Sequence, residues 1–201
     1  MKKILVLMLA AIVGIASINA ANPAKDAKKE GKKLMNEGWK SAPGKLPIVS
    51  QLENAYTKQL ETDENGYPKF IIGDAMSVGE NFDGAKFQAT ELAKLDVAGK
   101  IASDITAIID SQVANKQLEP SEAATLAETV GASKNLISKR LGAVIPLMEC
   151  YRILPNKNTE VRVMVGYSNA LAKKVVKEAI QEELKDKGQN LMDKLNKAIG
   201  L

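Results

Sequence analysis

The residues that could do chemistry are few, and two residue types set the limits. The chain of 201 residues contains no histidine and a single cysteine, Cys150. The sequence therefore excludes a Ser-His-Asp triad, a Cys-His pair and any metal site that uses histidine. A lone thiol cannot form a disulfide within the chain. Two interpretations of Cys150 stay open: a buried, unreactive thiol, or an intermolecular disulfide across a two-fold axis.

Carboxylates could supply acid–base chemistry, as paired Asp and Glu residues do in glycosidases. Most acids of this chain stand among lysines at helix spacing, which is typical of a solvated face. Asp74 is the exception, because it lies on the apolar face of a predicted strand, between Ile72 and Met76. We interpret Asp74 as the mark of a sheet edge or a bulge. The sequence predicts no catalytic residue, assigns no cofactor-binding residue and requires no cofactor.

Two other patterns resemble functional motifs. Residues 61–66, Glu-Thr-Asp-Glu-Asn-Gly, resemble the start of a calcium loop, with oxygen ligands at alternate positions and glycine at the sixth. The twelfth position is Ile72, where such a loop needs a bidentate glutamate, so we predict a turn and no metal site. Serine stands beside lysine at 133–134 and 138–139, but adjacent helix residues do not face each other, so no nucleophilic dyad is predicted.

The beginning of the chain has the layout of a secretory signal over residues 1–20. Lys2 and Lys3 precede an apolar run over 4–15, and small residues lead to a cleavage point after Ala20. The apolar run is too short to span a bilayer comfortably. No cysteine lies near the cleavage point, so we expect an exported protein, periplasmic or associated with the outer membrane, that is not lipid-anchored.

Positive charge is concentrated directly after the signal. Residues 21–45 hold seven lysines and three acids, whereas residues 46–201 are mildly acidic. The seven are Lys25, Lys28, Lys29, Lys32, Lys33, Lys40 and Lys45. A basic arm could bind an anionic envelope surface, or it could be a solvated, partly helical tail. Export and the lack of aromatic residues among the lysines argue against nucleic acid. Trp39 is read either as an exposed anchor or as a residue packed on the domain.

The hydrophobic periodicity predicts an α+β fold. Helices are expected over 24–39, 47–61, 83–116, 120–141 and 169–187, and strands over 69–78, 144–154 and 160–167. We predict a small three-stranded antiparallel sheet with the long helix on one face. The other face must then meet the terminal helices or another subunit. The predicted organisation after the signal is a basic helical arm and linker (21–66), an α+β domain (67–187) and a C-terminal helical tail (188–201).

A family resemblance rests on three segments. They are Phe-Ile-Ile-Gly-Asp-Ala at 70–75, the alanine-spaced helix at 85–93 and the alternating strand at 161–167. Over residues 67–185 this order of elements resembles the LPP-twenty lipoprotein family, which includes surface lipoproteins and flagellar-associated outer-membrane proteins. The domain of that family is similar to dodecins. The resemblance implies an envelope-associated, oligomerising, non-enzymatic protein.

From these features we expect a non-enzymatic envelope protein with a structural or scaffolding role. We expect it to form a homo-oligomer through the uncovered face of its sheet. The alternative is a dodecin-like binding module that holds a small lipid or aromatic ligand between subunits.

Overall fold

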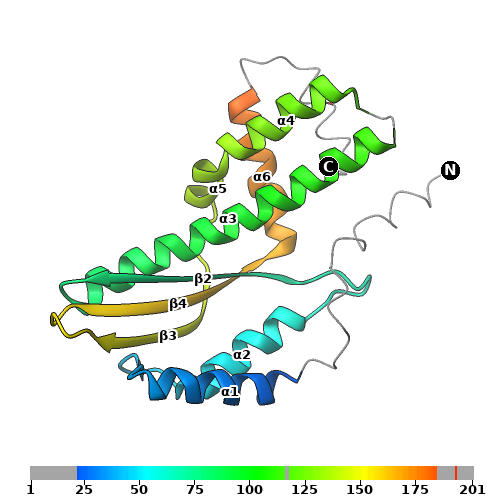
Figure 1. Cartoon of the computed structure of the whole chain (residues 1–201). Coiled ribbons are helices and arrows are strands. Elements are labelled where there is room, and N and C mark those ends of the chain that lie inside the picture. Colours follow the sequence, from blue (N-terminus) through cyan, green and yellow to red (C-terminus); the bar gives the residue numbers. More distant parts are fainter. Residues whose placement is uncertain (1–21, 116–117, 185–192, 194–201) are drawn as a thin grey trace.

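The computed structural model describes residues 22–115, 118–184 and 193, and Figure 1 shows the arrangement of its elements. In chain order these are α1 (Pro23–Asn36), β1 (Lys40–Ser41), α2 (Ile48–Leu60), β2 (Phe70–Gly79), α3 (Phe82–Ala114), α4 (Pro120–Ala132), α5 (Lys134–Arg140), β3 (Ile145–Ile153), β4 (Thr159–Ser168) and α6 (Asn169–Leu184). The α+β class is confirmed, and each of the three predicted strands is present, as β2, β3 and β4.

The sheet has four antiparallel strands, in the order β1-β3-β4-β2. The β3–β4 hairpin lies in the middle, and β2 pairs with β4 over its whole length, from Phe70 opposite Ser168 to Gly79 opposite Thr159. The prediction of three strands is wrong, because β1 adds a fourth at the outer edge of β3. A two-residue strand is too short to show the alternation of side chains by which strands are recognised in a sequence.

Helix α3 covers one face of the sheet and approaches it closely. Ala85, Ala89, Ala93 and Val97 are fully buried at intervals of four residues, which places them on one side of the helix. Opposite them the sheet has a glycine: a Cβ built on Gly73 would lie 2.2 Å from the carbonyl oxygen of Ala93 and 2.8 Å from Val97. Small residues on both surfaces therefore bring the helix backbone nearly into contact with β2.

The second half of α3 extends beyond the sheet, and α4, α5 and α6 pack around it (Figure 1). Ile101, Ile105 and Ile109 of α3 are buried in the same core as apolar residues of α4, α5 and α6. These partners include Leu126, Val130, Ile137, Val176 and Ala179. With 33 residues, α3 is about 50 Å long, so one helix joins the sheet to this group of helices.

Helices α1 and α2 cover the other face of the sheet (Figure 1). A second core lies there and combines Leu34 of α1, Leu52 of α2 and Met148, Cys150 and Met164 of the sheet. The expectation of an uncovered sheet face is therefore wrong, because the residues read as an arm fold back over it. One core spans the expected boundary at residue 66: α1 and α2 pack against the sheet, and β1 forms part of it.

The predicted signal (1–20) and most of the predicted tail (188–201) lie outside the described residues. Among the described residues, no helix combines the length and the apolar character that a membrane-spanning helix needs.

The close approach of α3 to Gly73 leads to a stability prediction. Replacing Gly73 by Ala should lower the free energy of unfolding by about 3 kcal/mol, because the new methyl group overlaps backbone that cannot move without displacing α3. Chemical denaturation followed by circular dichroism measures this loss.

The matched control is Gly131→Ala in α4, where an added Cβ meets nothing within 4 Å. That variant should gain about 0.5 kcal/mol, because alanine restricts the unfolded chain more than glycine does. Equal effects of the two substitutions would show that the contact at Gly73 is not tight.

Candidate functional site

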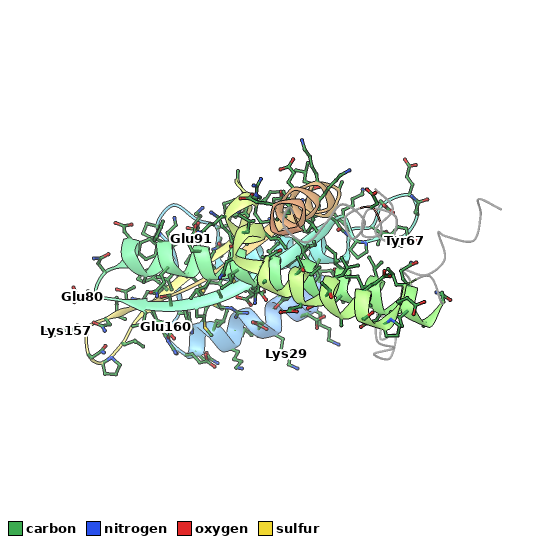
Figure 2. The ribbon with its side chains drawn as sticks, turned by 90° about the horizontal axis from the view of Figure 1, so that it is seen from above. Lys29, Tyr67, Glu80, Glu91, Lys157 and Glu160 are labelled. Carbon is green, nitrogen blue, oxygen red and sulfur yellow. The ribbon has the colours of Figure 1, made fainter. Side chains whose placement is uncertain are left out.

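The most distinctive surface of the molecule is the outer side of α1. Ala27, Gly31 and Leu34 are buried and fix the inner side of this helix against the rest of the fold. Five exposed lysines point away from that inner side. We call Lys25, Lys28, Lys29, Lys32 and Lys33 the lysine face. Figure 2 shows Lys29 at the margin of the molecule, beside α1.

Both ends of α1 are defined by local sequence. The side chain of Asn22 accepts a hydrogen bond from the backbone N–H of Lys25, and Pro23 occupies the first turn, where its missing N–H costs nothing. Gly38 ends the helix with φ +87°, and the N–H groups of Gly38 and Trp39 return to the carbonyls of Met35 and Leu34. This Schellman motif directs Trp39 back into the second core.

The charge of the lysine face is largely uncompensated. The sequence of α1 contains five lysines and two acids, a formal charge of +3. No described carboxylate lies within 4.0 Å of the ammonium groups of Lys25, Lys28, Lys29 or Lys32. An anionic partner can therefore approach these groups without displacing an existing ion pair.

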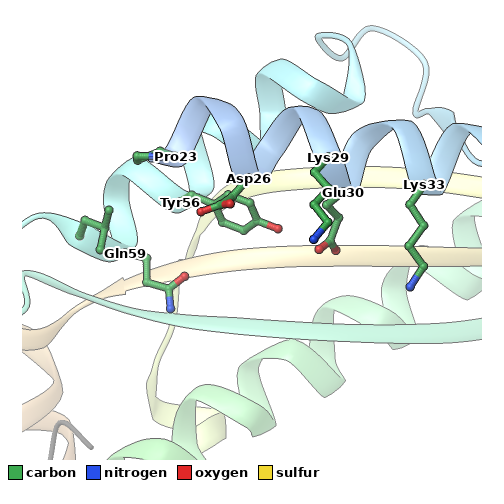
Figure 3. A pocket seen from close by; sticks show the side chains of 8 residues that line it. Pro23, Asp26, Lys29, Glu30, Lys33, Tyr56 and Gln59 are labelled. Atoms are coloured by element: carbon green, nitrogen blue, oxygen red, sulfur yellow. The ribbon is translucent and has the colours of Figure 1, made fainter. Parts of the chain in front are cut away.

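An open groove of about 610 Å³ runs beside the lysine face, between α1 and α2 (Figure 3). It is lined by Pro23, Asp26, Lys29, Glu30, Lys33, Tyr56, Gln59 and Leu60. Figure 3 shows Pro23 at one end and Lys33 at the other, with Tyr56 between them. The lining mixes both signs of charge with apolar groups, so the groove suits a small ligand that carries polar groups on an apolar body.

A network of three charged side chains ties α1 to the sheet next to this groove. The guanidinium of Arg162 in β4 binds both carboxylate oxygens of Asp74 in β2, with Nε–Oδ1 at 3.0 Å and Nη2–Oδ2 at 2.6 Å. Its Nη1 donates to Glu30 Oε1 of α1 at 2.7 Å. The side chain of Arg162 is only 16% exposed, so these bonds are partly shielded from water.

The network shifts the pKa values of Glu30 and Tyr56. Partial burial alone would raise the pKa of Glu30, but the hydrogen bond and charge of Arg162, with smaller contributions from Tyr56 and Lys33, outweigh it and leave that pKa below 4.5. Burial, followed by the charge and hydrogen bond of Glu30, raises the pKa of Tyr56 to about 12. The Tyr56 hydroxyl therefore stays protonated and donates to an ionised Glu30.

A buried acid, Glu149 of β3, connects the other elements. Its carboxylate lies 2.9 Å from Lys86 Nζ of α3 and 3.4 Å from Lys45 Nζ. The side chain of Gln51 accepts the N–H of Glu149 at 2.9 Å and donates to the carbonyl of Leu46 at 2.6 Å. The ion pair with Lys86 and the hydrogen bond with Gln51 come from different helices, so the arrangement holds α2 and α3 to β3.

The structure places the sequence-derived candidates apart from one another. Asp74 lies on edge strand β2, as predicted, and is paired with Arg162. Residues 61–66 form a turn in which the carboxylate of Asp63 accepts the N–H groups of Asn65 and Tyr67. Ser133 is buried, and its hydroxyl donates to the carbonyl of Thr129. Within the described ranges, no group of three acid or cysteine side chains could hold a metal ion.

Two residues that were read in alternative ways are both buried. The Trp39 side chain packs in the second core with the guanidinium of Arg152 over its ring at 4.8 Å, so the interpretation as an exposed anchor is wrong. Cys150 is fully buried, and burial raises the pKa of its thiol to about 12. A disulfide to a second chain would require this core to open.

Sequence reasoning missed Arg162, Glu30, Tyr56 and Glu149. The signal that could have identified Arg162 and Glu149 is a charged residue inside an apolar strand, since such a residue needs a partner when buried. Glu30 and Tyr56 lie on amphipathic helices and carry no comparable signal.

No protein-family model, curated protein or solved structure matches this chain. The resemblance to the LPP-twenty family therefore stays a prediction.

Removing the guanidinium of Arg162 should destabilise the protein. Arg162→Met leaves Asp74 and Glu30 facing each other without their shared cation, and we expect a loss of about 2 kcal/mol in the free energy of unfolding at neutral pH. The loss should shrink as the pH falls below 4.5, because protonation of Glu30 removes the same interaction from the wild-type protein. Denaturant titrations over a pH series measure both effects.

Arg140→Met is the control, because Arg140 pairs with Glu178 and Glu182 at an exposed surface. We expect about 0.5 kcal/mol or less for that pair. If both variants lost the same amount, the Arg162 network would contribute no more than a surface ion pair.

Tyr56 should ionise at unusually high pH. A tyrosine whose pKa is raised in the folded state supports folding below pH 10, and this contribution disappears as the pH rises toward 12. The ultraviolet absorbance of phenolate, taken as the difference between the wild type and Tyr56→Phe, should therefore titrate near pH 12. A difference that titrates near pH 10 would show that neither burial nor Glu30 favours the protonated form of Tyr56.

Proposed function

We propose that this is an exported, non-enzymatic structural or scaffolding protein of the cell envelope that binds an anionic surface through the lysine face of α1. The pattern of residues 1–20 supports export. The absence of histidine and the single cysteine support a role without catalysis. Association of its copies is part of the proposal.

The observation that carries the proposal is the fixed display of the five lysines. The inner side of α1 is buried, and Glu30 of the same helix is held by Arg162. The ammonium groups are therefore presented together on a folded surface, and binding need not order a flexible arm. A lysine close to an anionic lipid surface contributes about 1 kcal/mol, so the face together could give stable, salt-sensitive binding.

The groove beside α1 favours a second candidate, a small-ligand binding module. Its volume of about 610 Å³ is within the usual size of ligand sites, which is about 300 to 1,000 Å³. This site would lie within one chain, between α1 and α2, whereas the sequence suggested a site between subunits. A chromophore or lipid that co-purifies with the protein would favour this candidate.

Binding to anionic vesicles tests the main proposal. Purified protein beginning at residue 21 should sediment with vesicles of phosphatidylcholine and phosphatidylglycerol, and added salt should release it. Replacing Lys25, Lys28, Lys29 and Lys32 by Gln should weaken this binding by about 100-fold or more, because most of the attraction is removed.

The matched control replaces four exposed lysines outside α1, Lys69, Lys134, Lys139 and Lys174, by Gln. This control has the same net charge as the test variant and should bind nearly as the wild type does. Equal weakening of the two variants would mean that net charge, and not the lysine face, drives binding.

A further inference from the structure

The outer edge of β2 is a surface that none of the arguments above uses. β2 is the last strand of the sheet and pairs with β4 on one side alone. In an antiparallel pair, every second residue directs both its N–H and its C=O away from the neighbouring strand. An unpaired strand edge is a template for another strand unless it is covered.

The first half of this edge is covered by side chains of α3. The N–H of Asp74 donates to the carboxylate of Asp96 at 3.1 Å, and the carbonyl of Ile72 accepts from Lys100 Nζ at 2.6 Å. Asp96 and Lys100 also bind each other at 2.8 Å. These contacts show that the backbone N–H and C=O groups of the even-numbered residues of β2 point away from β4. They also show that the Asp96–Lys100 ion pair occupies the edge at residues 72 and 74.

The second half of the edge is open. By the same alternation, the backbone groups of Met76 and Val78 point outward. No described residue outside the sheet hydrogen-bonds to either one. The two residues are 54% and 43% exposed, and their side chains lie on the sheet face that α1 and α2 cover elsewhere. Two backbone positions and two apolar side chains are thus available side by side.

We propose that β2 pairs, antiparallel, with β2 of a second copy of this chain about a two-fold axis at Ser77. In this register Met76 lies opposite Val78 of the partner subunit, and Val78 lies opposite Met76 of the partner subunit. Both are hydrogen-bonded pairs that use the open N–H and C=O groups. The four apolar side chains meet on one face, and the sheet extends from four strands to eight.

The open segment favours a second copy because it is complementary to itself. A two-fold axis at Ser77 pairs the two open positions with each other. An axis at Met76 would instead set Val78 against Asp74 of the partner subunit, whose N–H is already bound by Asp96. The register at Ser77 therefore satisfies the open groups and leaves the Asp96–Lys100 cover intact. The short contact makes a weak, concentration-dependent dimer.

This pairing rests on the geometry of β2 and does not depend on binding to an anionic surface, yet it would affect that binding. The two-fold axis of an antiparallel pair is perpendicular to the sheet, so both copies keep α1 and α2 on the same side. The two lysine faces would point toward one surface, and bivalent attachment raises the apparent affinity without a new contact.

Light-scattering mass at increasing concentration tests the pairing. The wild-type mass should rise toward twice that of the monomer, whereas the double variant Met76→Lys, Val78→Lys should stay monomeric, because four lysines would meet at the axis. The control Ile145→Lys, Ile153→Lys changes two strand residues that are 41% and 61% exposed but lie on β3. It should dimerise as the wild type does. A monomeric wild type at every concentration overturns the proposal.

Cysteine cross-linking tests the register. Native Cys150 is buried, so it should not form a cross-link itself. Paired Cα atoms lie about 5.5 Å apart, within disulfide range, so a mixture of Met76→Cys and Val78→Cys chains should form a mixed disulfide under mild oxidation. Each variant alone should cross-link much less, because equivalent residues would be about 9 Å apart. Cross-linking of Met76→Cys alone at the rate of the mixture overturns the axis at Ser77.

Discussion

The close contact between α3 and β2 is the constraint on which the rest of this structure depends. With alanines on the helix and Gly73 on the strand, no side chain separates the two backbones. This proximity lets polar side chains of α3 reach the strand: Gln88 accepts from Ser77, and Asp96 and Lys100 bind the edge at residues 74 and 72. Larger core residues at this contact would lift α3 away, and those bonds could not form.

The second constraint is that one chain covers both faces of a small sheet. On one face the core is built from α3 and the helices around its second half, and on the other face α1 and α2 build the second core. Aromatic residues make up only 4% of the chain, so Ala, Val, Leu, Ile and Met fill these cores. The ion network of Arg162 orients the second core, because the bidentate pair with Asp74 links β4 to β2 and the bond to Glu30 holds α1 on the sheet.

Periodicity predicted the secondary structure because long apolar patterns are local. The strands at 69–78 and 160–167 and the long helix at 83–116 agree with β2, β4 and α3 to within two residues. The position of residues 21–66 could not be predicted in this way, since nothing local separates a helix that packs from a solvated arm of similar charge. The same limit applies to the ion network: Glu30 and Arg162 are 132 residues apart in sequence, and only the fold brings them together.

Covering both faces of the sheet also limits how copies could associate. A covered face offers no apolar layer to a second chain, so contact through the sheet must use an edge. At one edge, β1 pairs with Cys150 and Tyr151, and Gln51 binds the backbone of Glu149 beside them. At the other edge, Asp96 and Lys100 cover β2 only as far as Asp74. The open positions at Met76 and Val78 therefore leave β2 able to pair with another strand over one short segment.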